Sequence, residues 1–144
     1  MITDKLLRVS TDQAVTTTAV SSDTVDLSQA RDMGEGGELI MNFAVTEAFA
    51  GGTSTKFEVI IADNAALSSN VQVIGSSDAV VTASLPLGTN IAVRLNPIIG
   101  SKGKQYLGAR YTVSGTNTAG KVTADVVMDI QDGKKFYASG FSVV

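Results

Sequence analysis

Hydrophobic and polar residues alternate with a period of two along most of the chain, a pattern typical of strands that bury one face. Residues 38–46, ELIMNFAVT, place Leu39, Met41, Phe43 and Val45 on one side of such a strand. Four later segments show the same alternation. Their expected inward residues are Phe57, Val59 and Ile61; Ile91, Val93 and Leu95; Leu107, Ala109, Tyr111 and Val113; and Val122, Ala124, Val126, Met128 and Ile130.

The pattern predicts about eight short strands separated by clusters of Gly, Ser, Asn and Pro. Their expected ranges are 38–46, 55–62, 90–95, 106–114 and 121–130, with shorter strands at 13–20, 71–75 and 79–83. One or two helical turns are expected in 27–34, with Ser28 as the cap. Because no long amphipathic helix is evident, we expect an all-β fold, a sandwich or barrel. Residues 1–144 are expected to form one domain, with possible arms at 1–10 and 132–144.

The composition narrows the chemistry that the chain can perform. It has 144 residues, a net charge of −3, and neither cysteine nor histidine. Disulfides, thiolate metal sites and the commonest general base are therefore ruled out. We expect no enzyme activity, no cofactor and no bound metal. No apolar run reaches the length of a membrane span, and the net negative charge does not favour nucleic acid, so we expect neither partner.

Charge is unevenly distributed along the sequence. Residues 1–78 carry eleven acidic and four basic side chains, whereas 79–124 carry five basic and no acidic ones. The five are Arg94, Lys102, Lys104, Arg110 and Lys121. Two interpretations stay open: the bias is incidental, or the folded molecule has a basic side that meets an acidic partner.

The segment GSKGKQYLGARY, residues 100–111, looks most like a binding site, because it holds three glycines and three cations. It fails the phosphate-loop pattern at both ends, where Ile98 replaces the first glycine and Gln105 the hydroxyl residue. Ser101 and Lys104 have the spacing of a serine–lysine catalytic pair, but the glycines oppose the helix that such a pair needs. We therefore expect a positively charged loop that leads into a core strand.

Other candidate sites are weaker. Tyr106 and Arg110 could share a sheet face and stack on a nucleic acid base, although the acidic total opposes it. Asp125 and Asp129 lack the pattern of a calcium loop, and we expect them to be solvated on the outer face of their strand. The aromatic residues Phe136 and Tyr137 in the last segment are expected to cover a sandwich edge or to contact a partner.

The chain resembles the capsid cement, or decoration, proteins of short-tailed double-stranded DNA bacteriophages. The likeness lies in MITDKLLRVS, QAVTTTA, DTVDLSQARDMGEG, NPIIGSKGKQYLGARYTV and TADVVMDIQDGKKFY, which follow one another along nearly the whole chain. The resemblance implies a jelly-roll β-sandwich that forms a homodimer on the outer surface of the virion. There it would clamp neighbouring copies of the major capsid protein against the pressure of packaged DNA.

We expect the capsid-facing residues to be the basic group Arg94, Lys102, Lys104 and Arg110, together with Leu6, Leu7 and Arg8 of the N-terminal segment and Phe136 and Tyr137. Three alternatives stay open: a carbohydrate-binding module, a cell-wall hydrolase, and another virion component such as a head–tail adaptor. The absence of tryptophan weakens the first two, since sugar-binding clefts usually contain it.

Overall fold

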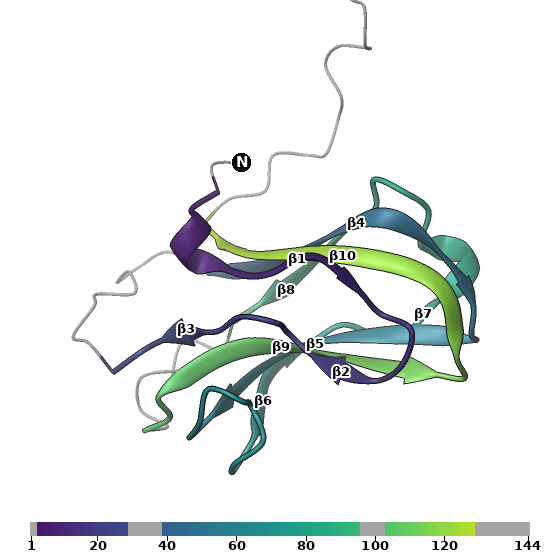
Figure 1. Cartoon of the computed structure of the whole chain (residues 1–144). Coiled ribbons are helices and arrows are strands. Elements are labelled where there is room, and N and C mark those ends of the chain that lie inside the picture. The colour runs from purple at the N-terminus through teal and green to yellow at the C-terminus, as the bar shows by residue number, and fades with distance from the viewer. Residues whose placement is uncertain (1–2, 29–38, 96–102, 129–144) are drawn as a thin grey trace, which may run out of the picture.

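Two antiparallel sheets pack face to face in the computed structural model, which describes residues 3–28, 39–95 and 103–128 (Figure 1). Sheet A has the strand order β1-β10-β4-β8, with bounds β1 (Arg8–Ala14), β10 (Asn117–Val127), β4 (Ile40–Gly51) and β8 (Asn90–Arg94). Sheet B has the order β2-β9-β5-β6, with bounds β2 (Ala19–Val20), β9 (Tyr106–Ser114), β5 (Ser54–Ala62) and β6 (Gln72–Ser76). Sheet B also includes β3 (Val25–Asp26), paired with β9, and β7 (Val80–Val81), paired with β5. Two short 3-10 helices, η1 (Lys5–Leu7) and η2 (Thr82–Ser84), complete the described elements.

The order of pairing is that of a jelly roll. The first and last strands, β1 and β10, pair with each other. Three further pairs are nested inside this one along the chain: β2 with β9, β4 with β8, and β5 with β6. A ribbon of four such nested pairs, rolled so that its strands alternate between two sheets, is the eight-stranded double-sheet jelly roll. The predicted all-β, jelly-roll-like sandwich of about eight strands is confirmed.

The predicted ranges of the longer strands agree with the structure to within a few residues. The segment 106–114 coincides with β9, and 55–62 and 90–95 coincide with β5 and β8 to within one residue. Strand β4 runs further than predicted, to Gly51, where the chain crosses to sheet B. Gly51 has φ +87°, and a Cβ there would lie 2.6 Å from the backbone nitrogen of Thr118, so only glycine fits this crossing without strain.

The prediction of one strand over 13–20 is wrong. The chain leaves sheet A at Ala14, turns, and enters sheet B as β2 at Ala19. The range expected as an N-terminal arm is also partly built into the fold, because Arg8–Ser10 begin β1 and Val9 and Ser10 are fully buried. The range 132–144 and residues 29–34 of the predicted helical turns lie outside the described residues.

The main core lies between the sheets and includes the residues that the alternation assigns to it, such as Met41, Phe57 and Leu107. Aromatic rings form its centre: Phe43 and Phe57 are tilted against each other with centroids 5.3 Å apart, and both rings contact Tyr111 edge-on. The hydroxyl of Tyr111 donates a 2.7 Å hydrogen bond to Ser10 Oγ, which ties β9 to the first strand of the opposite sheet. Burial raises the pKa of Tyr111, and the hydrogen bond to Ser10 opposes that rise.

Two predictions for the strand 121–130 need correction. Met128 was expected to point inward, but β10 ends at Val127 and Met128 is 71% exposed. Asp125 was expected to be solvated, but it is buried, and Arg8 Nε lies 2.7 Å from its Oδ1. Asp125 does face outward from the sandwich, yet the guanidinium of Arg8, its partner across β1 and β10, compensates its charge.

Candidate interaction surface

The described residues that directly precede β9, 103–105, are anchored to the molecule by Lys104. The ammonium of Lys104 lies 2.9 Å from Oδ1 of Asp63, the residue that directly follows β5. The Lys104 side chain is only 12% exposed. The hydrogen bond from Lys104 holds the pKa of Asp63 below its usual range, assisted by a hydrogen bond from Asn70. Lys104 therefore binds within its own chain, while Lys102 lies outside the described residues.

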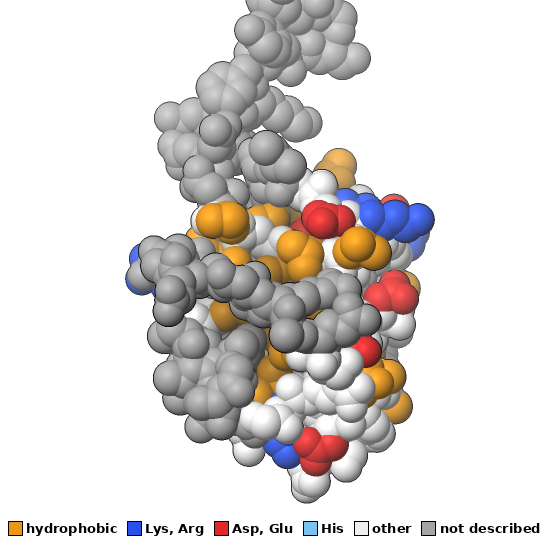
Figure 2. Space-filling view, turned by 90° about the vertical axis from the view of Figure 1, so that its left-hand side faces the viewer, with side chains coloured by type: hydrophobic (Ala, Val, Ile, Leu, Met, Phe, Trp, Pro, Cys, Tyr) orange, Lys and Arg blue, Asp and Glu red, His pale blue; other side chains and the backbone are white. Residues whose placement is uncertain are grey.

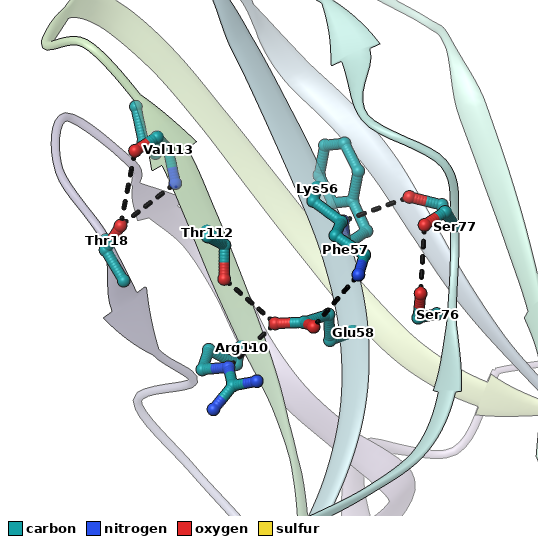
Figure 3. Close-up of polar contacts among 9 residues, drawn as sticks. All are labelled: Thr18, Lys56, Phe57, Glu58, Ser76, Ser77, Arg110, Thr112 and Val113. Carbon is teal, nitrogen blue, oxygen red and sulfur yellow. Dashed lines mark hydrogen bonds and ion pairs between the residues drawn. The ribbon is translucent and has the colours of Figure 1, made fainter.

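Arg110 belongs to a polar cluster on the outer face of sheet B that is centred on Glu58 (Figure 3). Glu58 Oε2 accepts hydrogen bonds from Arg110 Nε at 2.7 Å and from Thr112 Oγ1 at 2.8 Å, and Lys56 Nζ lies 3.5 Å from Oε1. Burial by itself raises the pKa of Glu58, but these hydrogen bonds and the two cations outweigh it, so the pKa is lowered. The charge of Arg110 is thus used to compensate a buried carboxylate.

The surface between Tyr106 and Arg110, considered above for base stacking, is filled by the protein itself. Leu67, from the loop between β5 and β6, packs over Gly108, where a Cβ would lie 2.4 Å from Leu67 Cδ1. Tyr106 packs against the small second core that Leu67 forms with Ile60 and Ala62. The ring of Tyr106 therefore covers hydrophobic side chains of its own chain.

Within the described residues, bases of the second half of the sequence pair with acids of the first half, because strands from the two halves lie side by side. Lys121 Nζ lies 2.6 Å from Glu47 Oε2, in addition to the pairs Lys104–Asp63 and Arg110–Glu58. The hydrogen bond and charge of Glu47 raise the pKa of Lys121, and the same contact lowers the pKa of Glu47. Three of the five bases in 79–124 thus pair with acids of the first half, which contradicts a concentrated basic side. Arg94 is exposed at the end of β8.

The N-terminal candidates have different surroundings. Asp4 accepts a 2.9 Å hydrogen bond from the backbone of Leu6 and so caps η1. Leu6 is 72% exposed, whereas Leu7 packs against the main core and Arg8 is paired with Asp125. Figure 2 shows hydrophobic side chains on the described surface of the sandwich end that carries η1 and β3. Leu6 is therefore the candidate best placed for contact, and Phe136 and Tyr137 lie outside the described residues.

An uncharged surface, absent from the expectations drawn from the sequence, lies on residues 79–93. Residues 79–93 contain no charged side chain, and they expose Val81 and Leu87 by 53% and 69%. The long gap between charges was a signal that could have identified this segment, since interface centres are depleted of charge. The segment includes β7, η2 and the first four residues of β8, the edge strand of sheet A.

Two absences among the described residues bear on other classes of function. No group of three or more His, Cys, Asp or Glu side chains lies close enough there to hold a metal ion. None of the helices in the described ranges is long and apolar enough to cross a membrane.

Comparison with known proteins gives one assignment. The sequence matches none of the curated proteins with which it was compared. A family model described as Bbp16 matches residues 9–126, which extend from the second residue of β1 to the last but one of β10 and so cover both sheets. Because the match covers most of the chain, this protein belongs to the Bbp16 family.

Proposed function

We propose that this protein is a capsid cement protein, a structural component of the bacteriophage virion. It binds the outer surface of the head as a homodimer and clamps neighbouring copies of the major capsid protein. The observation that carries the proposal is that the segments resembling such proteins build the frame of the fold. QAVTTTA contributes to β1 and β2, the segment ending in YLGARYTV forms most of β9, and TADVV ends β10. The likeness therefore extends over the sandwich rather than over a local motif.

The internal contacts suit a body that resists deformation. The pair Arg8–Asp125 connects residues 117 positions apart, and the hydrogen bond from Tyr111 to Ser10 connects the two sheets. Contacts that are distant in sequence must all break together for the sandwich to open, which favours cooperative resistance to stress. A rigid sandwich loses little conformational entropy when it docks, so more of its contact energy remains for binding.

Stabilisation of the shell requires only binding. A protein that binds the mature shell and not its ruptured form stabilises the mature form by RT ln(1 + [L]/Kd), about 2.7 kcal/mol per site at a hundredfold excess over Kd. A homodimer that contacts two neighbouring capsomers gains further from avidity, because its second contact is intramolecular. Many modest contacts repeated over the shell then oppose rupture.

Mixing the purified protein with phage heads that lack it tests this proposal. We expect saturable co-sedimentation with the heads, and only a weak decrease in binding when salt is raised, because Lys104 and Arg110 are paired internally. Heads already decorated with the protein are the control and should bind little more. If the protein stays in the supernatant at every concentration, the proposed function is wrong.

A further inference from the structure

Strand β8 is the last strand of sheet A, and no other strand in the described part of the chain pairs with its outer side. Its register with β4 is unbroken from Ile40↔Arg94 to Ala44↔Asn90. Beyond the two ends of this register, Leu95 N donates to Leu39 O at 2.9 Å and Val45 N donates to Thr89 O at 2.8 Å. In an antiparallel ladder, hydrogen-bonded and non-bonded pairs alternate, so Ile91 and Val93 bond to β4. The N–H and C=O groups of Asn90 and Ala92 therefore point away from it.

The other sheet edges carry features that discourage strand addition. Strand β1 has two register irregularities, β2 has only two residues, and β6 is interrupted by an irregularity opposite Val59 and Ile60. Bulges, short length and charged side chains are the usual protections of an edge. Asn90 and Ala92 are exposed and uncharged, and within the described ranges no segment bonds to the outward side of their backbone.

The open edge is short and its two ends are closed. At one end β6 lies so near that a Cβ on Gly75 would be 2.4 Å from the carbonyl oxygen of Arg94. At the other end the chain turns at Pro86–Thr89, where Thr89 N donates to Pro86 O at 3.2 Å. The accessible backbone is therefore that of Asn90–Ala92, which offers up to four hydrogen-bonding groups.

We propose that an extended segment of the shell protein docks on β8 as an added strand beside Asn90–Ala92. This inference rests on the proposed function and identifies the contact through which binding occurs. A second copy of β8 fits less well than a linear segment. Suppose two β8 strands paired antiparallel, with Asn90 of one copy opposite Ala92 of the other. Gly88 of the second copy, and the turn attached to it, would then lie against Arg94 of the first copy, where β6 already lies.

The edge also defines the side chains that the docked segment should carry. Ile91 is half-buried and packs against the main core, so the residue opposite it should be apolar and point between the sheets. The two flanking residues would lie on the outer face near Asn90 and Ala92, in the charge-free region 79–93. Because residues 79–93 contain no acid and Arg94 follows on the same face of β8, a basic side chain would be buried there without a compensating partner, so these residues should not be basic.

Ala92→Pro tests the inference, with Ala92→Ser as the matched control. Proline removes the outward N–H and places a ring on the edge, but it breaks no bond of the β4–β8 ladder, and proline is tolerated at such positions. We expect Ala92→Pro to weaken binding to undecorated heads about tenfold or more, since a lost hydrogen bond and a steric clash together cost at least about 1.4 kcal/mol. Ala92→Ser keeps the N–H and should bind like the wild type.

Hydrogen exchange of the wild-type protein gives a second measurement that does not depend on the folding of the variant. The amides of Asn90 and Ala92 should exchange quickly in the free protein and at least tenfold more slowly on heads. Unchanged exchange, or Ala92→Pro binding equal to wild type, would overturn the docked strand and leave the proposed function standing. A wild-type dimer that Ala92→Pro dissociates would also overturn it, because a second copy would then occupy the edge. If the wild type fails to bind heads at all, the proposed function itself fails.

Discussion

Single charged residues in this protein act mainly on their own neighbours. Glu58 is the clearest case, because Arg110, Thr112 and Lys56 surround a carboxylate that is almost fully buried. The sequence indicated that Arg110 is a cation on a strand, but it could not identify Glu58 as its partner. That pairing depends on the register of β5 against β9, which joins residues 52 positions apart.

Glu58→Gln should change the response of stability to acid. The pKa of Glu58 is lower in the folded protein than in the unfolded chain. Its contribution to the free energy of unfolding is therefore complete above the unfolded pKa of about 4.3 and is lost as the pH falls through the folded pKa. At pH 7 the variant should lose about 1 kcal/mol of unfolding free energy, and the loss should shrink toward pH 3. Urea denaturation between pH 3 and 7 measures this, with Asp78→Asn at an exposed position as the control. A loss that is equal at every pH would contradict the assigned role.

At the scale of elements, the loop between β5 and β6 packs on β9 because the side chain of Leu67 fits over Gly108, which has none. Leu67 has φ +53°, an uncommon conformation for a bulky residue, and it lies over Gly108 in β9. Asn64 Oδ1 accepts hydrogen bonds from the backbones of Ser68 and Ser69, each at 3.0 Å. The loop therefore covers the outer face of sheet B as a fixed element.

Gly108→Ala should displace this loop. The added methyl would lie 2.4 Å from Leu67 Cδ1 and 2.8 Å from Ser21 Oγ, and overpacking of this kind costs about 1–3 kcal/mol. In a Leu67→Ala background the same change should cost less, because one of the two clashes is gone. Chemical denaturation of the two single variants and the double variant measures the coupling. Strictly additive losses would show that Leu67 does not rest on Gly108.

The elements themselves were predictable where alternation was strong and not where it was weak. The strand 106–114 alternates clearly, and the structure confirms its bounds. Residues 8–14 were not predicted as one strand, because Ser10–Gln13 are all polar and show no alternation. Ser10 is nevertheless buried, with a hydrogen bond from Tyr111, and register irregularities interrupt the strand. The open edge at β8 was also beyond prediction, since a sequence does not show which strand lies last in a sheet.

At the scale of the whole molecule, the jelly roll brings acidic residues of the first half of the sequence next to basic residues of the second half. These residues meet because the long strands of the first half lie beside strands of the second half: β4 lies between β10 and β8, and β5 lies beside β9. The pairs Lys104–Asp63, Arg110–Glu58 and Lys121–Glu47 form within the molecule, and the uncharged segment 79–93 lies on one edge. Adhesion through backbone and apolar contacts therefore suits it better than electrostatic attraction.

The central claim is that binding of this protein strengthens the shell. The most direct test is the temperature at which DNA-filled heads release their DNA, measured at increasing occupancy by the protein, with occupancy determined on the same samples. The account predicts that the release temperature rises with occupancy and levels off when the sites are full. Fully occupied heads that release DNA at the temperature of bare heads would contradict it.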